Sequence, residues 1–431
     1  MPRINRADSI PTDPGKVLEW INSHSKARNH MTRLEEEFEG HQMILSLPAA
    51  DSGRPDNRLM NNYAGYISTV NIGYFMGQPV RYVAENENEE FMAELQDVFN
   101  YNDEQDENME LAREASIKGV AFEILYIDED ANVRFDAVQS ENVILVRDNT
   151  IESRVLFAIR YLEKDGDIIQ ADVYDSQFRT RYEFHAGKEK MIEDPVPHFF
   201  EEVPIVEFPN NEERMGDFER VLSLILAYDK GQSNTANDFD DFTDAYLILR
   251  NMSGTEESEI LAMKKHRVLL LGADDGAEWL TKTMQDTAAE HYKSRLSNDI
   301  HKFSMTPNLT DEAFAGNLSG VALEFKLWGL EQSAAQKERK FKRALQRRVE
   351  LICQYLSLKG RPLYDWRSVS PVFTRNMPMN VPDLVKMVVD LRGILSNRTL
   401  LSQLPFVSDP VVEMDRVREE NEDWVNLEEE E

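Results

Sequence analysis

The acidic run DDFTD near the middle of the chain has the residue types and the spacing to bind magnesium. On a helix, Asp240, Asp241 and Asp244 would share one face, as in the aspartate-rich motif with which polyprenyl synthases hold Mg²⁺ against a diphosphate. That chemistry needs a second acidic motif opposite the first, and no second DDxxD or comparable Asn, Ser and Glu triplet occurs. A magnesium-dependent prenyl-transfer enzyme is therefore one hypothesis, and an acidic helix end that faces solvent is the other.

Residues 276–283, GAEWLTKT, imitate a phosphate-binding loop. Thr281 stands where that motif needs its second glycine, and the surrounding pattern predicts a strand rather than a loop that leads into a helix. GxGxxG, HExxH and GxSxG do not occur, and the eight histidines do not pair at ligand spacing on a helix. We therefore expect no enzymatic activity, no cofactor and no metal site.

One strongly basic cluster lies within residues 337–348. Its cations can pair with carboxylates at i,i+4 or on another subunit, can contact DNA, or can bind a different protein in a generic scaffold. The cluster consists of Lys337, Arg339, Lys340, Lys342, Arg343, Arg347 and Arg348. Lys337, Lys340, Arg343 and Arg347 are the residues that we expect to contact DNA or a neighbouring subunit.

Two helical segments and the loop between them position this cluster. Residues 286–304 contain no Pro or Gly, and this helix must end near Thr306 because the residue before Pro307 is pushed out of the α region. The second helix starts at Ser319, a good N-cap, with Leu318 and Leu323 placed as a hydrophobic staple. Its apolar face is Leu323, Leu327, Leu330, Ala334, Phe341, Leu345, Ile352 and Tyr355.

Gly360 is the first convincing stop for this second helix, although Gly329 weakens it locally. At about 1.5 Å per residue the helix is roughly 58 Å long, far above the average of about 11 to 12 residues. Helices of this length are typical of large assemblies.

The loop over 305–318 is polar, with Asn308, Thr310, Asp311, Glu312 and Gly316 among few apolar side chains. Because it lies between two long helices, it is either a positioned functional loop or an ordinary, rather long connection.

The rest of the chain divides into helical and β-rich regions. Asp13 and Pro14 are an N-cap and N1 pair for a first helix through Ile21. The acidic runs ENENEE and DEQDENME are expected on solvated helix faces. Further helices are expected over 26–38, 61–76, 217–239 and a hairpin at 381–420, an antiparallel sheet over 119–184, short strands around a small helix over 245–285, and single strands near 78–85 and 370–375.

Composition limits the classes of function. The 431 residues suffice for two or three domains. With 48 Lys and Arg against 79 Asp and Glu, the net charge is −31, which excludes a broad surface for phosphate backbones. Cys353 is the single cysteine, so no disulfide within the chain and no multi-thiolate zinc site is possible. The first residues lack a signal peptide's apolar core, and no stretch approaches about 18 apolar residues; we expect a reducing, aqueous compartment and no membrane partner.

The order of several short strings resembles the portal proteins of tailed bacteriophages, specifically the siphophage-type portal family. The resemblance extends from about Met31 to Glu419. The strings are NN (61–62), YFMGQPVRY (74–82), AREASIKGVAFEILYIDED (112–130), AIRY (158–161), VPIVEFPNN (203–211), DFERV, AYDKGQSNTAND (227–238) and PNLTDEAFAGNLSGVALEFKL (307–327). The chain departs from the family pattern at Phe38–Gly40, Asn308 and Glu324, which leaves the charge of the loop open.

The resemblance implies an α+β, portal-type fold. Its parts would be N-terminal helices and a β-rich wing (1–216), a stem helix (217–244), a small α/β clip (245–285), a second stem helix (286–304), a tunnel loop (305–318), a long wing helix with a strand (319–376) and a helical crown with an acidic tail (377–431).

The resemblance also implies a ring, typically of twelve subunits, at one capsid vertex of the virion, assembled in the host cytoplasm. Double-stranded DNA would pass through its channel during packaging and ejection, and an acidic ring would conduct DNA without holding it. Expected partners are the terminase large subunit, a head-completion or adaptor protein, and capsid and scaffolding proteins. The tunnel-loop contacts would be Thr306, Pro307, Asn308, Thr310, Asp311 and Glu312, and the clip contacts to motor and adaptor Lys264, Lys265, His266, Arg267, Asp274, Asp275 and Glu278.

Overall fold

The protein has an α+β fold, as the sequence predicts. The computed structural model describes residues 4–11, 13–48, 55–84, 89–164, 168–185, 188–243, 246–250, 276–280, 286–310, 320–377, 381–402, 404, 407, 410 and 412–418. The chain divides into two compact units: residues 1–316 with 325–375, and residues 317–324 with 376–431.

The β-structure of the first unit is almost entirely antiparallel, in agreement with the prediction for 119–184. A six-stranded sheet has the order β1-β5-β6-β7-β8-β9, in which only the short β1 runs parallel to its neighbour, and a second sheet has the order β10-β3-β4. The strands are β1 (Asn5–Arg6), β3 (Val120–Ile127), β4 (Val133–Val138), β5 (Val143–Arg147), β6 (Val155–Lys164), β7 (Ile168–Tyr174), β8 (Phe178–His185), β9 (Lys188–Pro197) and β10 (Ile205–Pro209). Short 3-10 turns lie at η1 (Met43–Ser46), η2 (Ser140–Asn142) and η3 (Glu219–Val221).

Helix α1 (Pro14–Glu39) is one continuous helix, so the prediction of two helices separated near residue 22 is wrong. The polar stretch NSHSKARN contains no Pro or Gly, and Ser23 and Ser25 donate to the carbonyls of Trp20 and Asn22 without interrupting the helix. The predicted start is confirmed, because the Asp13 side chain accepts from Gly15 N at 3.0 Å.

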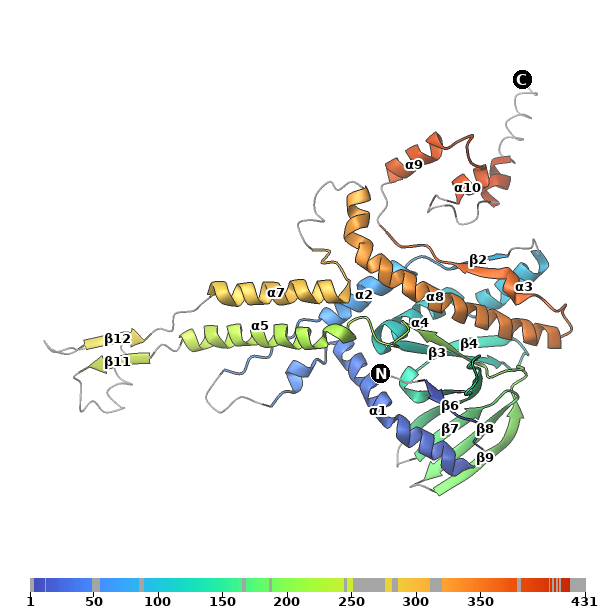
Figure 1. Cartoon of the computed structure of the whole chain (residues 1–431), viewed down its shortest axis with the longest axis horizontal. Helices are drawn as coiled ribbons and strands as arrows, with labels where there is room; N and C mark the ends of the chain where they lie inside the picture. The colour runs from blue at the N-terminus through green and yellow to red at the C-terminus, as the bar shows by residue number, and fades with distance from the viewer. Residues whose placement is uncertain are drawn as a thin grey trace. The chain divides into compact units, whose positions relative to one another are not determined.

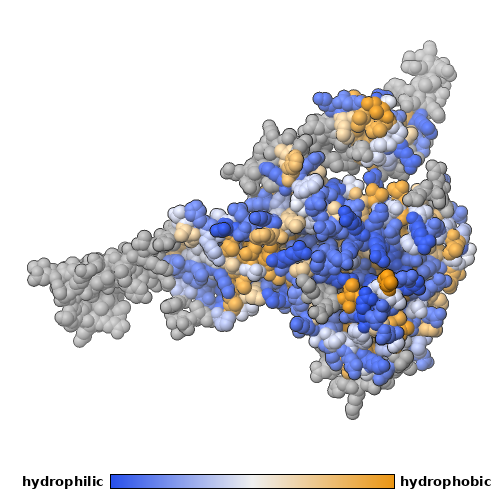
Figure 2. Space-filling model, in the orientation of Figure 1, coloured by the Kyte–Doolittle hydropathy of each residue, from blue (hydrophilic) through white to orange (hydrophobic). Residues whose placement is uncertain are grey.

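Helix α1 lies along one face of the six-stranded sheet (Figure 1). Val17 and Ile21 pack there against side chains of β5 to β8, including Phe157 and Ile159. The exposed face in Figure 2 is mostly hydrophilic, with apolar side chains in smaller groups. Among the described residues, no helix is both long and apolar enough to cross a membrane.

Helices α2 (Tyr63–Met76), α3 (Glu89–Tyr101) and α4 (Glu104–Lys118) connect α1 to the second sheet. The strand predicted near 78–85 is β2 (Arg81–Ala84), and it pairs with β13 (Val369–Val372), which follows the turn η5 (Trp366–Ser368).

Helices α5 (Leu222–Thr243) and α7 (Asp286–Ser304) lie side by side and lead to the two-stranded ribbon of β11 (Tyr246–Arg250) and β12 (Gly276–Leu280) (Figure 1). The prediction for 286–304 is confirmed, whereas the helix predicted over 217–239 is a 3-10 turn followed by α5. An apolar core holds the start of α5 and the end of α7 against α1, α2 and α4. Its buried residues include Leu34, Ile67, Ile117, Val221, Ile225 and Ile300. The prediction of short strands within 245–285 is confirmed by β11 and β12. The small helix predicted in the same range lies outside the described residues.

Helix α8 (Gly320–Leu358) is 39 residues long. Every member of its predicted apolar face from Leu327 to Tyr355 is buried, and Leu323 is half-buried. The predicted stop is confirmed, because Gly360 adopts φ +86° just after the helix. The proposed N-cap and staple residues Ser319 and Leu318 lie outside the described residues.

The second unit contains α9 (Val381–Asp390), α10 (Asn397–Leu401) and a further helical stretch at 412–418. The described part of this region therefore consists of short helical pieces rather than the predicted two-helix hairpin. Ser396 caps α10, because its hydroxyl accepts from Thr399 N at 3.2 Å.

Candidate functional site: the α7–α8 junction and the long helix

The chain leaves α7 through a defined turn. Met305 adopts a left-handed φ of +58°, and Thr306 N donates to His301 O at 3.2 Å. This hydrogen bond joins residues five positions apart and is the 6→1 bond of the Schellman motif. The left-handed position of that motif is usually occupied by glycine. Helix α7 therefore ends at Ser304, two residues before Thr306 and in agreement with the predicted end near Thr306.

Side chains of α2 and α7 hold the first part of the connecting loop. Tyr66 Oη donates to Pro307 O at 2.8 Å and accepts from Leu309 N at 2.9 Å. Asn71 Nδ2 donates to Thr306 Oγ1 at 2.9 Å. His301 Nδ1 donates to Thr306 O at 3.0 Å, and burial lowers the pKa of this imidazole. Residues 306–309 are thus fixed from two helices, as a positioned loop requires.

The six residues predicted to line a tunnel loop have different environments. Thr306 is only 1% exposed, so its side chain is unavailable to a duplex, and we reassign it to anchoring the loop. Asn308 is half-buried, and its Oδ1 accepts from Thr310 N and Oγ1 at 3.1 and 2.7 Å. Thr310 is exposed, and Pro307 is half-buried. Asp311 and Glu312 lie outside the described residues.

The basic cluster of α8 is divided by its surroundings. Lys337 is 4% exposed and forms an ion pair with Asp217, so its side chain is unavailable to DNA or to another subunit. Lys340 pairs with Glu212, and Arg347 pairs with Glu202 and with Glu350. Within the described part of the chain, Arg339, Lys342 and Arg343 form no ion pair, and Arg339 and Arg343 are exposed.

Arg348 fastens α8 to the second sheet. Its guanidinium is 0% exposed and donates to Glu123 Oε2 at 2.9 Å, to Glu104 Oε1 at 3.0 Å and to Asn108 Oδ1 at 2.9 Å. Its Cζ also lies 4.5 Å from the centroid of the Phe135 ring. Burial raises the pKa of Glu123, while the charge of Arg348 opposes that rise. The buried carboxylates of Glu123 and Glu104 therefore share the guanidinium of Arg348 as their positively charged partner.

The burial of Glu104 and Asn108 corrects the prediction for DEQDENME, because these two residues of the run face the protein interior. A signal was present in the sequence: Arg348 falls on the apolar face of α8, between Leu345 and Ile352, and Glu123 interrupts an otherwise apolar strand.

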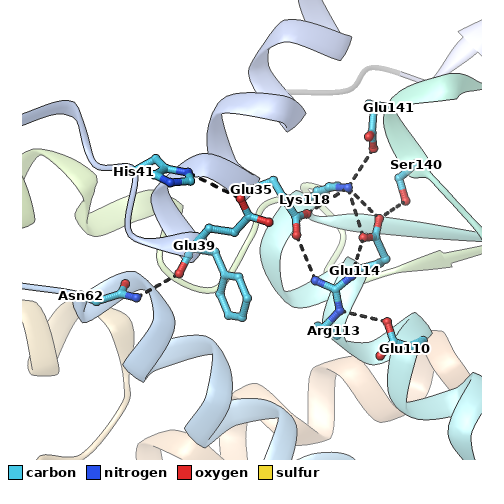
Figure 3. Close-up of polar contacts among 11 residues, drawn as sticks. Glu35, Glu39, His41, Asn62, Glu110, Arg113, Glu114, Lys118, Ser140 and Glu141 are labelled. Atoms are coloured by element: carbon cyan, nitrogen blue, oxygen red, sulfur yellow. Dashed lines mark hydrogen bonds and ion pairs between the residues drawn. The ribbon is translucent and has the colours of Figure 1, made fainter. Parts of the chain in front are cut away.

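A second ion-pair cluster joins α1, α4 and η2 (Figure 3). Lys118 Nζ lies 3.0 Å from Glu35, 3.0 Å from Glu114 and 2.8 Å from Glu141. Arg113 contacts Glu35 and Glu110, each at 3.0 Å. Burial acts to raise the pKa of Glu35, but the two neighbouring cations outweigh it and leave that pKa below its usual value. The cluster connects the helices structurally.

The other motifs proposed from the sequence are not brought together into a site among the described residues. Asp240 is exposed and accepts from Asn57 Nδ2 at 2.5 Å, and Asp244 lies outside the described residues. In the described parts of the chain, no group of three or more His, Cys, Asp or Glu side chains is placed to hold a metal. The first five residues of the phosphate-loop imitation form strand β12 (Gly276–Leu280), as predicted, and residues 281–283 lie outside the described residues. Glu278 lies on β12, and the other predicted clip contacts are outside the described residues.

The chain is similar to known proteins over most of its length. The family described as "Phage portal protein, SPP1 Gp6-like" matches residues 18–426. The portal protein of Bacillus phage SPP1 is 26% identical over 399 residues, which cover 88% of this chain and 78% of that protein. The portal protein of Clostridium phage phiCD119 is 27% identical over 380 residues, 82% of each chain.

Proposed function

Because the chain belongs to the SPP1 Gp6-like family of phage portal proteins, we propose that it forms the portal ring at one vertex of a tailed-phage capsid. The family match over 18–426 is the observation that carries the proposal. In this role the protein is structural rather than enzymatic, and capsid and packaging proteins are its partners. Copies of the chain surround a channel through which DNA enters the capsid and later leaves it.

The loop over 305–318 narrows that channel. Tyr66, Asn71 and His301 fix its first residues from α2 and α7, so each copy presents the following polar residues in the same place. The negative charges of Asp311 and Glu312 repel phosphates from all sides and keep the duplex centred. The net charge of −31 per chain favours passage of DNA over retention in the same way.

The α5 and α7 pair is the stem, and residues 245–285 at its end form the clip that meets the terminase large subunit and later the head-completion protein. Two observations support this proposal: α5 and α7 lie side by side, and both lead to the β11–β12 ribbon. The charges for these contacts come from the basic run Lys264–Arg267 and from the acidic residues Asp274, Asp275 and Glu278.

On α8, Arg343 and Arg339 are the cations that meet a neighbouring subunit or DNA, since Lys337, Lys340 and Arg347 are engaged within the chain. Of the four residues predicted to make this contact, only Arg343 is retained, and Arg339 is added because it is exposed and forms no ion pair with any described residue.

The test replaces Asp311 and Glu312 with Lys and measures DNA translocation in capsids assembled with the variant. Two new cations per subunit add phosphate contacts around the ring, so packaging should slow, and added salt should relieve the slowing. The control replaces Glu129 and Asp130, two exposed acids of the β3–β4 turn, with Lys. The proposal fails if the loop variant packages at the control's rate with unchanged salt dependence, or if neither protein enters capsids.

A further inference from the structure

A pocket between α1, the segment after it and α5 contains oxygen atoms without hydrogen-bond partners. Its volume is about 350 Å³, and Glu37, Gln42 and Asp229 line it together with apolar side chains of α5. These three residues come from three parts of the chain and are 5%, 2% and 1% exposed. The pocket belongs neither to the proposed channel loop nor to the ion-pair clusters already described.

Gln42 is the informative residue. Its Nε2 donates to Asn61 O at 3.2 Å, which orients the amide, but its buried Oε1 has no hydrogen-bond partner. A buried carbonyl oxygen without a partner costs about 1 to 3 kcal/mol. A ligand that supplies positive charge to this oxygen would remove the penalty.

The two carboxylates also keep oxygen atoms available. Asp229 Oδ1 accepts from both Asn61 N and Asn61 Nδ2 at 2.9 Å, and Glu37 Oε1 accepts from Met43 N at 3.3 Å. No hydrogen bond to Asp229 Oδ2 or Glu37 Oε2 is formed by any described residue. Asn61 contacts both Gln42 and Asp229, so it holds these two side chains beside each other.

We propose that Glu37, Gln42 and Asp229 form a binding site for one divalent cation that prefers oxygen ligands, Ca²⁺ or Mg²⁺. Two carboxylates and one amide carbonyl are ligands that such cations take in proteins, with water completing the coordination. The two negative charges balance the cation. The irregular donor set and the space for water favour Ca²⁺, because Mg²⁺ demands a more regular octahedron.

Electrostatics agree with this geometry. Burial raises the pKa of Glu37 and of Asp229, and the charge of Asp229 raises that of Glu37 further. The positive charge of Arg33 and the hydrogen bond from Met43 N act to lower the pKa of Glu37, but they do not outweigh burial. Arg33 and Arg220 also line the pocket, but Arg33 Nη2 is directed to Met43 Sδ and Arg220 faces Glu213. Neither forms an ion pair with Glu37 or Asp229 in the described structure.

The cation would connect α1 to α5, the helix that leads to the β11–β12 ribbon. The test titrates Ca²⁺ and, separately, Mg²⁺ into the metal-free full-length protein by calorimetry at 0.15 M NaCl, and counts sites per chain. Wild type should show one saturable site per chain, tighter for Ca²⁺. Glu37→Gln and Asp229→Asn, which keep the side-chain shape, should each weaken that site at least tenfold.

The control is Glu129→Gln, which removes an exposed carboxylate far along the chain and should leave the site unchanged. Gln42→Glu adds a third carboxylate and should tighten Ca²⁺ binding several-fold, so it decides the question if the other two variants fail to fold. Absence of a saturable site in wild type overturns the proposal and leaves the two carboxyls as proton-binding groups. Unchanged affinity in the variants overturns it as well. Because sites are counted per chain, the outcome is independent of whether the protein forms a portal ring.

Discussion

Replacing Arg348 with Met should destabilise the contact between α8 and the second sheet more than any other single charge removal on this helix. Met keeps most of the side-chain volume and a similar helix propensity, so the change removes mainly the positive charge and its hydrogen bonds. Glu123 and Glu104 then remain buried without their cation. Breaking a buried ion pair in this way costs about 3 to 5 kcal/mol.

Hydrogen exchange measures this loss locally, even in an oligomer. Since about 1.4 kcal/mol corresponds to a factor of ten, the slowest amides of β3 should lose roughly two to three and a half orders of magnitude of protection. The matched control is Lys342→Met on the same helix, because Lys342 has no ion pair in the described structure and is not one of the proposed contact residues. That variant should stay within about 0.5 kcal/mol of wild type.

The loss of stability in Arg348→Met should depend on pH in a defined direction. The pKa of Glu123 in the folded protein is above its usual value, so its contribution to stability is present below the unfolded pKa and is lost as the pH rises through the folded pKa. Without Arg348 the folded pKa rises further, and the variant's deficit should shrink as the pH falls from 7.5 towards 5. If Arg348→Met loses no more protection than Lys342→Met, or if its loss of stability grows on acidification, Arg348 does not fasten α8 as described.

Two further predictions concern the loop and the clip. Tyr66→Phe removes the hydroxyl that contacts Pro307 O and Leu309 N, so it should cost about 1 kcal/mol and speed exchange of the Leu309 amide; unchanged exchange would show that the loop is held elsewhere. Reversing the charges of Lys264, Lys265 and Arg267 to Glu should block packaging while particles of wild-type size still assemble, and normal packaging by this variant would exclude 245–285 as the motor contact.

The helices with clear terminal signals could be predicted from the sequence. Residues 286–304 match α7 because Pro307 limits the helix, and α8 follows a regular apolar face up to Gly360. The sequence predicts two helices in place of α1 because a polar stretch looks like the end of a helix. That stretch has no Pro or Gly, the residues that would have ended the helix.

The partners of buried charges could not be predicted in the same way. The acidic run around Glu104 predicts a solvent-exposed side chain, and nothing near Glu104 in the sequence identifies its partner Arg348, which is 244 residues away. Lys337 likewise finds Asp217 at a separation of 120 residues. Such contacts depend on how the sheet and α8 pack together, so a single sequence identifies the cations but not their partners.

The most direct test of the proposed function is the size and symmetry of the purified particle. Mass photometry together with negative-stain images down the symmetry axis should show a closed ring with a central channel and a mass near twelve times 49.8 kDa. A monomer or a dimer under conditions in which the chain is folded would contradict the assignment of this protein as a portal ring.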